Sequence, residues 1–337
     1  MKAVLFEKPG SFREVNKDLR RLEDGEALIR VDGCGICGTD LHIVDGRSRS
    51  TPPVVLGHEY SGVVEDAGKE TALRVGSRVA IDPNISCGTC FYCRRGLVHL
   101  CTNLRALGVD RDGGMAQYSI VPVKQLHLLP DDMSSDEGAL IEPVSCIVHG
   151  LDRVHLHAGD SVVILGGGTA GIVMLQLAVR AGAALTIVVE PQSQKRGLAK
   201  RLGADLVIDP ASEDVTARIL EQTQVGADVV IECVGRPETM RMSLDLARRG
   251  GTVEFFGVCP IGERIDVEPN AIYAKELTIV GSYVNPHTFT RSAALLHAKV
   301  VKAAEMDIQH FPLDAVHEAF ANLRKGNALK TIIDPWR

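Results

Sequence analysis

The stretch "SVVILGGGTAGIVMLQLAVRAGAALTIVVE", residues 161–190, decides the fold of this chain. It is long and apolar enough to suggest a membrane span, but three consecutive glycines and Arg180 interrupt it. Its pattern changes from a short apolar run to a longer helical run and back. We therefore predict strands at 161–165 and 185–190, with a helix at 170–181 between them.

The same alternation continues to residue 281. Further strands are predicted at 206–209, 228–232, 252–257 and 277–281, and further helices at 193–202 and 238–249. Strands that alternate with helices form a parallel sheet covered on both faces, and six strands suit a doubly wound dinucleotide-binding fold. We expect this Rossmann domain at residues 146–282.

Three glycines follow the first predicted strand of this domain. Gly166, Gly168 and Gly171 satisfy G-x-G-x-x-G, and the predicted helix begins inside the motif. Glycines at these positions allow a tight turn and a close approach of the backbone to a pyrophosphate, while the helix N-terminus supplies N–H donors. These residues are predicted to bind a dinucleotide coenzyme.

An acidic residue closes the second strand. Glu190 lies nineteen residues after Gly171, where a carboxylate can bond both ribose hydroxyls and would repel a 2′-phosphate. This favours NAD(H) over NADP(H). Lys195 and Arg196 lie nearby and keep NADP(H) as the alternative, although they equally suit the solvated face of a helix.

The rest of the chain has a different sequence pattern. Its N-terminal part consists of short β-type runs closed by Gly, Pro or Asp. After the parallel-sheet region come two predicted helices, 288–303 and 314–325, and a last strand, "KTIID". This tail is too short to fold alone, so we expect residues 1–145 and 283–337 to form one β-rich domain.

Composition limits the functional classes. A chain of 337 residues is expected to hold two domains, and a net charge of −6 disfavours nucleic acid and anionic membranes as partners. The N-terminus, "MKAVLFEKPG", has too short an apolar run for a signal peptide. We therefore expect a cytoplasmic protein whose nine cysteines are reduced thiols or metal ligands.

A four-cysteine cluster is the strongest metal motif. The segment "CGTCFYCRRGLVHLC" places Cys87, Cys90, Cys93 and Cys101 at C-x2-C-x2-C-x7-C spacing. Four thiolates complete the tetrahedral shell of zinc and leave no position for a substrate, so this zinc would be structural. Ligation of an iron–sulfur cluster is the alternative, because its ligands have similarly close spacing.

Three further stretches offer ligands for a second metal. They are "CGICGTDLH" (34–42), "GHEY" (57–60) and "IEP" (141–143). A Cys, a His and a carboxylate around zinc leave one coordination position open for water or substrate. Each stretch alone is weak: a His-Glu pair is usually a surface feature, and Glu142 beside Pro143 could mark a turn.

Together and in this order, the motifs resemble those of the zinc-containing medium-chain alcohol and polyol dehydrogenases, over nearly the whole chain. "CGICGTDLH" and "GHEYSGVV" are similar to the metal motifs of that family, and "LGGGTAG" to its coenzyme loop. "IEPVSCIVHG" resembles the sorbitol dehydrogenase branch. The resemblance implies a GroES-like catalytic domain joined to the Rossmann domain, with one catalytic and one structural zinc ion per chain.

The resemblance also assigns roles to residues. It implies that Cys37 and His58 bind the catalytic zinc, together with either Glu59 or Glu142, the other of which would hold the metal-bound water. Asp40 matches a carboxylate that orients the zinc-bound histidine, or else forms a local Asx turn. Cys34, although spaced like a partner of Cys37, is predicted to be a small buried side chain.

The implied reaction is hydride transfer from a substrate alcohol to the nicotinamide. Zinc acts as a Lewis acid that lowers the pKa of a bound hydroxyl. Thr39 matches the hydroxyl that first takes the proton, and His42 the histidine that passes it to solvent. Lys330 resembles a basic residue that reaches the pyrophosphate.

The substrate is less well defined. Sorbitol-type enzymes carry an Arg-Tyr pair where this chain has Val284 and Asn285, so Asn285 and His287 are predicted to contact a different polyol, a cyclitol or a sugar acid. Threonine dehydrogenases are the nearest sibling branch. Zinc-free reductases and non-catalytic crystallins share the fold but normally lack these ligands. The resemblance also implies a homodimer or homotetramer.

Overall fold

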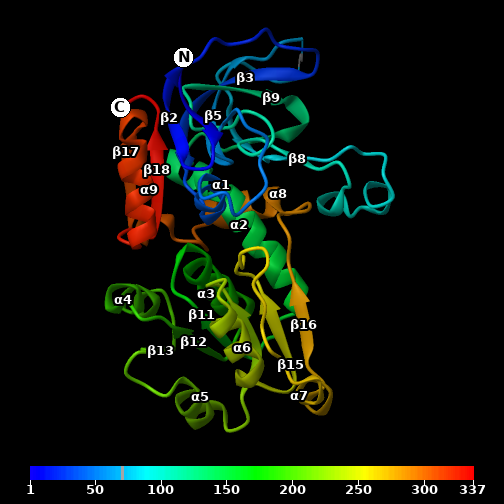
Figure 1. Cartoon of the computed structure of the whole chain (residues 1–337), viewed down its shortest axis with the longest axis vertical. Coiled ribbons are helices and arrows are strands. Elements are labelled where there is room, and N and C mark those ends of the chain that lie inside the picture. Colours follow the sequence, from blue (N-terminus) through cyan, green and yellow to red (C-terminus); the bar gives the residue numbers. More distant parts are fainter. Residues whose placement is uncertain (70–71) are drawn as a thin grey trace. The chain divides into compact units, whose positions relative to one another are not determined.

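A computed structural model describes residues 1–69 and 72–337 (Figure 1). The chain divides into two compact units. The β-rich unit comprises Met1–Ser145 and Asn285–Arg337, and the parallel-sheet unit comprises Cys146–Val284. No helix in the described part of the chain combines the length and the apolar character that a membrane crossing requires. The apolar stretch 161–190 therefore forms separate elements within the parallel-sheet unit.

The parallel-sheet unit is built on six strands in the order β13-β12-β11-β14-β15-β16, and every neighbouring pair is parallel. This is the strand order 3-2-1-4-5-6, which is typical of the doubly wound dinucleotide-binding fold that was expected. The strands are β11 (Ser161–Leu165), β12 (Leu185–Val189), β13 (Leu206–Ile208), β14 (Ala227–Glu232), β15 (Ala247–Phe255) and β16 (Thr278–Gly281). The helices are α3 (Thr169–Ala181), α4 (Ser193–Arg201), α5 (Val215–Thr223), α6 (Pro237–Leu246) and α7 (Pro269–Lys275).

The central strands are apolar along their length because both faces of the sheet are covered. Val163, Ile187, Val230 and Val253 are fully buried in one cluster. The prediction of a helix at 238–249 was wrong at its C-terminal end. Ala247 already pairs with Ala227 of β14, so tertiary pairing ends the helix early.

The β-rich unit contains a seven-stranded sheet in the order β10-β6-β5-β3-β18-β17, with β9 also paired to β3. A three-stranded sheet (β2-β1-β4) and a two-stranded sheet (β7-β8) complete it. The strands are β1 (Lys2–Lys8), β2 (Ser11–Asn16), β3 (Glu26–Gly35), β4 (Val54–Val55), β5 (Glu59–Asp66), β6 (Arg78–Ile81), β7 (Asn84–Ile85), β8 (Arg105–Ala106), β9 (Tyr118–Pro122), β10 (Leu126–Leu128), β17 (Ile308–Pro312) and β18 (Lys330–Asp334).

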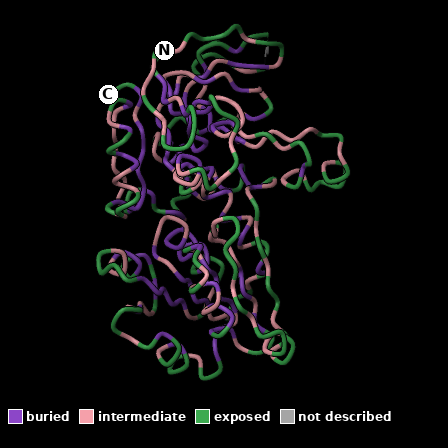
Figure 2. Tube along the Cα trace, in the orientation of Figure 1, coloured by how far each residue is buried: buried purple, intermediate pink, exposed green. Residues whose placement is uncertain are grey.

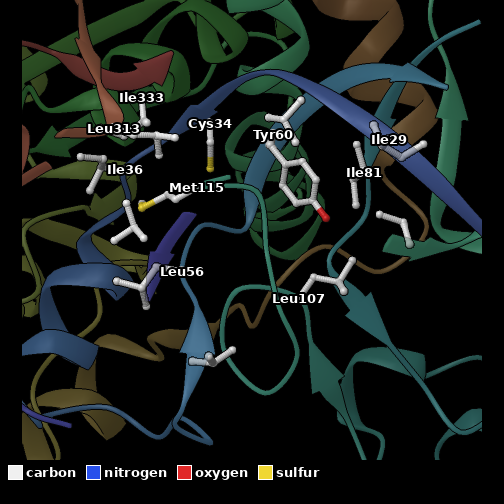
Figure 3. Packing of buried hydrophobic residues seen from close by; sticks show 14 of the residues in the cluster. Ile29, Cys34, Ile36, Leu56, Tyr60, Ile81, Leu107, Met115, Leu313 and Ile333 are labelled. Atoms are coloured by element: carbon white, nitrogen blue, oxygen red, sulfur yellow. The ribbon is translucent and has the colours of Figure 1, made fainter. Parts of the chain in front are cut away.

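The C-terminal tail completes this sheet. Strand β18 pairs antiparallel with β3 and parallel with β17, and the helices α8 (Phe289–His297) and α9 (Val316–Lys325) flank these strands in sequence. The predicted helix 288–303 was too long, because the regular turns end at His297. The core beneath the sheet includes Cys34, Tyr60 and Met115, which Figure 3 shows among other buried side chains.

A long helix, α2 (Ser135–Val154), corrects the interpretation of "IEP" as a turn. Its start is fixed by a capping box, in which the Glu137 backbone N–H donates to Ser134 Oγ and the Ser134 backbone N–H donates to Glu137 Oε2. Pro143 lies inside the helix. Capping and burial of the apolar face thus outweigh the helix-breaking tendency of proline.

Candidate metal and coenzyme sites

Cys37, His58 and Glu59 form a cluster that we call the Cys37 group, in which His58 and Glu59 are buried and Cys37 is half-buried. Cys37 caps the short helix α1 (Gly38–Val44) directly after β3, and Glu59 begins β5. Because β3 and β5 pair antiparallel with Gly35 opposite Glu59, the end of one strand lies beside the start of the other. One ligand atom from each of the three residues lies within 4.8 Å of the others.

Asp40 lies beside both Cys37 and His58, and the role predicted for it toward a zinc-bound histidine stays a prediction. Its Oδ2 accepts a 2.8 Å hydrogen bond from the Cys37 backbone N–H, which caps α1. Its Oδ1 lies 3.4 Å from His58 Nδ1, and both residues are buried. A carboxylate that faces one ring nitrogen orients the other toward a metal. A thiolate, an oriented imidazole and a carboxylate therefore fit a zinc ion with an open position.

A buried ion pair adjoins this group. Lys330 Nζ on β18 donates to Glu59 Oε2, and both side chains are almost completely buried. A side chain at Gly35 would lie 2.5 Å from Glu59 Oε2 and 2.6 Å from Lys330 Cε, so the pair requires glycine there. Burial is the largest single effect and lowers the pKa of Lys330, but the charges of Glu59, Cys37 and Glu142 and the hydrogen bond to Glu59 together outweigh it, so the pKa is raised.

Glu142 lies on α2 and is also buried. Its charge contributes to the raised pKa of Lys330. Within residues 1–69 and 72–337, however, the cluster of ligand atoms holds Glu59 and not Glu142. The Lys330 ammonium group is paired with Glu59 inside the β-rich unit, and the pyrophosphate contact predicted for it stays a prediction.

The two residues of the predicted proton path lie on α1. Thr39 and His42 are half-buried and three residues apart, which places them on one face of the helix that Cys37 caps. A hydroxyl and an imidazole thus lie on one face of the helix that begins at Cys37. His42 lies in the last turn of this helix.

The four cysteines of residues 87–101, which we call the cysteine lobe, also converge. Their ligand atoms lie within 4.8 Å of one another, with Cys90 Sγ 3.5 Å and Cys87 Sγ 4.0 Å from Cys93 Sγ. The lobe is mainly half-buried or exposed (Figure 2). Hydrogen bonding, first of all from the Thr89 backbone N–H, lowers the pKa of Cys87 to about 5. Four close sulfur atoms, one of them readily ionised, fit a closed zinc site.

The glycine loop has the geometry that a coenzyme needs. Gly166 has φ 100°, which favours glycine, and a Cβ at Gly171 would lie 1.8 Å from the Gly166 carbonyl oxygen. Gly168 caps α3 without any side-chain bond and has open space around it. Glu190 Oε2 accepts the Gly167 N–H at 2.8 Å, so the predicted ribose carboxylate lies against this loop.

Asn285 and His287, predicted to contact substrate, lie in internal contacts of the β-rich unit. The amide oxygen of Asn285 accepts from Asn84 Nδ2 at 2.6 Å, and its nitrogen donates to Ser145 Oγ at 2.8 Å. His287 Nε2 lies 3.1 Å from the Gly96 carbonyl oxygen of the cysteine lobe. A substrate contact by Asn285 would require its network to open, and the role predicted for it stays a prediction.

Two parts of the chain match known protein families. Residues 23–131 match the family model for the alcohol dehydrogenase GroES-like domain, and residues 170–298 match that for zinc-binding dehydrogenases. D-arabinitol dehydrogenase 1 of Uromyces fabae is 31% identical, covering 99% of this chain and 97% of that protein. The chain belongs to the zinc-binding alcohol dehydrogenase family. It is thus an oxidoreductase that uses zinc and a nicotinamide coenzyme to interconvert an alcohol and a ketone in a small molecule.

Other members of the family are similar over the same length. L-threonine 3-dehydrogenase of Pyrococcus horikoshii is 34% identical, with 98% of each chain covered. A solved structure of a zinc-binding dehydrogenase from Sinorhizobium meliloti bound to NADP is 41% identical, has a TM-score of 0.96 and covers 99% of each chain. The GroES-like and Rossmann folds expected from the sequence are therefore confirmed for this dehydrogenase.

Proposed function

We propose that this dehydrogenase uses NAD to oxidise a secondary alcohol of a polyol or related sugar-derived substrate to the ketone. The observation that carries the proposal is the Cys37 group, where a half-buried thiol, a buried imidazole and a buried carboxylate meet. The same chain holds a complete glycine loop. The similarity to D-arabinitol dehydrogenase favours a polyol.

In this proposal Cys37, His58 and Glu59 hold the catalytic zinc, and the cysteine lobe holds a second, structural zinc. The catalytic zinc supplies Lewis acidity toward the substrate hydroxyl. Glu59 can bond Lys330 through one oxygen and face the metal with the other. Glu142, whose charge also acts on Lys330, is the alternative carboxylate. Asp40 keeps His58 oriented.

The residues of α1 would move the proton. The Thr39 hydroxyl accepts it from the substrate hydroxyl, and His42 passes it to solvent. An imidazole suits the second step because its ordinary pKa lies near neutrality. A variant with His42→Gln should therefore lose activity mainly at low pH, where proton release is hardest.

NAD is proposed as the coenzyme because of Glu190, whose carboxylate lies at the glycine loop. Arg196 does not present a free charge to a 2′-phosphate: it bonds the carbonyls of Glu190 and Pro191 and pairs with Asp209 at 3.0 Å. The relative bound to NADP makes NADP the alternative to test.

A homo-oligomer is proposed because β16 is an edge strand of the parallel sheet. Ile279 on this strand is 38% exposed and the nearby Tyr283 is 55% exposed. Unpaired edge groups beside apolar side chains are a template for pairing with another chain. The sequence similarity does not separate the proposed dimer from a tetramer.

Oxidation of threonine at its secondary alcohol is the second candidate. It is favoured by the 34% identity to L-threonine 3-dehydrogenase, slightly above that to the arabinitol enzyme. Both reactions use the same alcohol chemistry and differ only in the groups that bind the rest of the substrate.

The test is to follow reduction of NAD and of NADP over a panel of polyols, cyclitols, aldonates and L-threonine. We expect NAD reduction with at least one polyol, inhibition by a zinc chelator, and recovery when zinc is returned. Activity with threonine alone would select the second candidate. Activity that survives complete removal of zinc would contradict the proposed mechanism.

A further inference from the structure

The turn of α2 that carries Glu142 is bonded to the segment 285–288. Ser145 Oγ donates to the Glu142 carbonyl oxygen at 2.6 Å, and Thr288 Oγ1 donates to the Ser145 carbonyl oxygen at 2.7 Å. Ser145 is completely buried and Thr288 is 2% exposed. Two segments far apart in sequence are thus held together at the position of this carboxylate.

These contacts continue as a directed chain of hydrogen bonds. Asn84 Nδ2 donates to Asn285 Oδ1 at 2.6 Å, and Asn285 Nδ2 donates to Ser145 Oγ at 2.8 Å. Because Ser145 accepts from Asn285, its single hydroxyl proton is directed to the Glu142 carbonyl. Asn285 is only 2% exposed, so water does not readily replace either bond.

The helix needs support at this turn. Pro143 follows Glu142 directly and has no N–H, so the carbonyl of Ala139 lacks the donor that an α-helix normally provides. A proline inside a helix also crowds the preceding turn. The bonds from Ser145 and the 285–288 segment act on this weakened turn, and they fix the place of Glu142.

We infer that Asn285 and Ser145 are positioning residues that hold the turn of α2 that carries Glu142 in place. The inference rests on the proposed function, in which Glu142 acts next to the catalytic zinc. Neither residue belongs to the Cys37 group, so they act through the turn of α2 and not on the reacting atoms. This also gives Asn285 a role other than the substrate contact predicted for it.

The test uses holoenzyme in which cobalt replaces zinc. The visible spectrum of a cobalt-loaded Cys37→Ser variant, subtracted from that of the unsubstituted protein, leaves the bands of the Cys37 group. We expect Asn285→Ala and Ser145→Ala to shift these bands and to lower kcat by about ten- to hundredfold, with KM little changed. The double variant should be hardly worse than either single variant, because the residues act in one chain.

Two further variants distinguish the positioning role from a general loss of stability. Asn285→Asp keeps the side-chain volume and the acceptor for Asn84 but cannot donate to Ser145 when ionised, and it should also shift the bands. The matched control is Ser243→Ala. Ser243 Oγ donates to the Met240 carbonyl at 2.7 Å, three residues back in α6, and Ser243 is equally buried. This control should lower stability and leave the cobalt bands unchanged.

The outcomes separate the two proposals. Cobalt bands that are present but unmoved by the Asn285 and Ser145 variants would overturn this inference alone. Equal shifts in the Ser243→Ala control would overturn it as well. Absence of the difference bands would contradict the proposed metal site, and the inference would fall with it.

Discussion

In the cysteine lobe, four ligands of one kind come from residues 87–101, on a surface loop with short 3-10 turns. In the Cys37 group, three different ligands come from the end of β3 and the start of β5; His58 and Glu59 are buried, and Glu59 also pairs with the buried Lys330. A closed set of like ligands suits a metal that holds a loop together. A mixed, buried set with a charged neighbour suits a metal that acts on a substrate.

Replacing one cysteine in each site should separate these roles most strongly. We expect Cys37→Ser to lower kcat/KM by roughly a thousandfold or more, because several kcal/mol of transition-state stabilisation depend on the metal. Its thermal stability should change little. Cys90→Ser should have the opposite effect. Its Tm should fall markedly, and its activity should decrease only in proportion to the fraction of protein that is unfolded.

Zinc content and activity of both variants decide this prediction. Each should retain one zinc of the proposed two. Cys259→Ser is the control, since Cys259 lies outside both groups. Equal loss of stability in the Cys37→Ser and Cys90→Ser proteins would contradict the difference between the sites.

The buried ion pair offers a second test. Lys330→Met should destabilise the zinc-free protein by about 3–5 kcal/mol, because Glu59 is left as a buried charge without its partner. Bound zinc should reduce this loss of stability, since the metal would also neutralise the charge of Glu59. Denaturant unfolding with and without zinc measures both effects. If Glu59→Gln does not restore stability to Lys330→Met, the pairing is not the cause.

Glu254 is the contrasting buried carboxylate, in the parallel-sheet unit. It is completely buried on β15, and neither of its oxygens makes a hydrogen bond of ordinary geometry with the described residues, although the Ser282 side chain lies near enough to affect its pKa. Burial raises its pKa from 4.5 to about 7, and Ser282 and Arg153 are too weak to offset this. The folded state therefore keeps the proton longer than the unfolded state, and stability falls as pH rises from about 4.5 to 7.

Glu254→Gln should therefore stabilise the protein in a pH-dependent way. The gain should be small near pH 4 and reach about 3 kcal/mol above pH 7, since each pKa unit corresponds to about 1.4 kcal/mol. Unfolding curves of both proteins across this range measure the difference. A gain that does not vary with pH would show that the carboxyl group does not titrate as described.

The smallest effect is expected in the cysteine lobe. Thr89 Oγ1 lies 3.6 Å from Cys87 Sγ, but backbone N–H groups supply the main donors. Thr89→Ala should therefore weaken zinc retention by less than about tenfold. Zinc release to a chromophoric chelator measures this. A larger loss would mean that the lobe depends on side chains beyond its four cysteines.

The difference between the cysteine lobe and the Cys37 group also explains which features could be predicted from the sequence. The cysteine lobe and the glycine loop are local, so spacing alone identifies Cys87 to Cys101 and Gly166 to Gly171. The Lys330–Glu59 pair depends on β18 lying beside β3, which no local pattern indicates. Gly35, at the end of β3, is a signal that could have pointed to a close approach of other side chains to this strand.

Other differences have physical causes of the same kind. The helix α2 was not predicted because Pro143 suggests a break in helical structure. The segment "SSDE" at its start is nevertheless typical of a helix N-terminus capped by Ser134. The substrate contact of Asn285 stays a prediction, and no local pattern indicates its partners Asn84 and Ser145, because they become neighbours only in the folded chain.

Anomalous X-ray diffraction at the zinc edge, from crystals of the purified holoenzyme, tests the central claim most directly. We predict two peaks per chain, one among the four sulfur atoms of the cysteine lobe and one bounded by Cys37, His58 and Glu59. A single peak, in the lobe, from protein that reduces NAD with a polyol would contradict the assignment of the Cys37 group as the catalytic metal site.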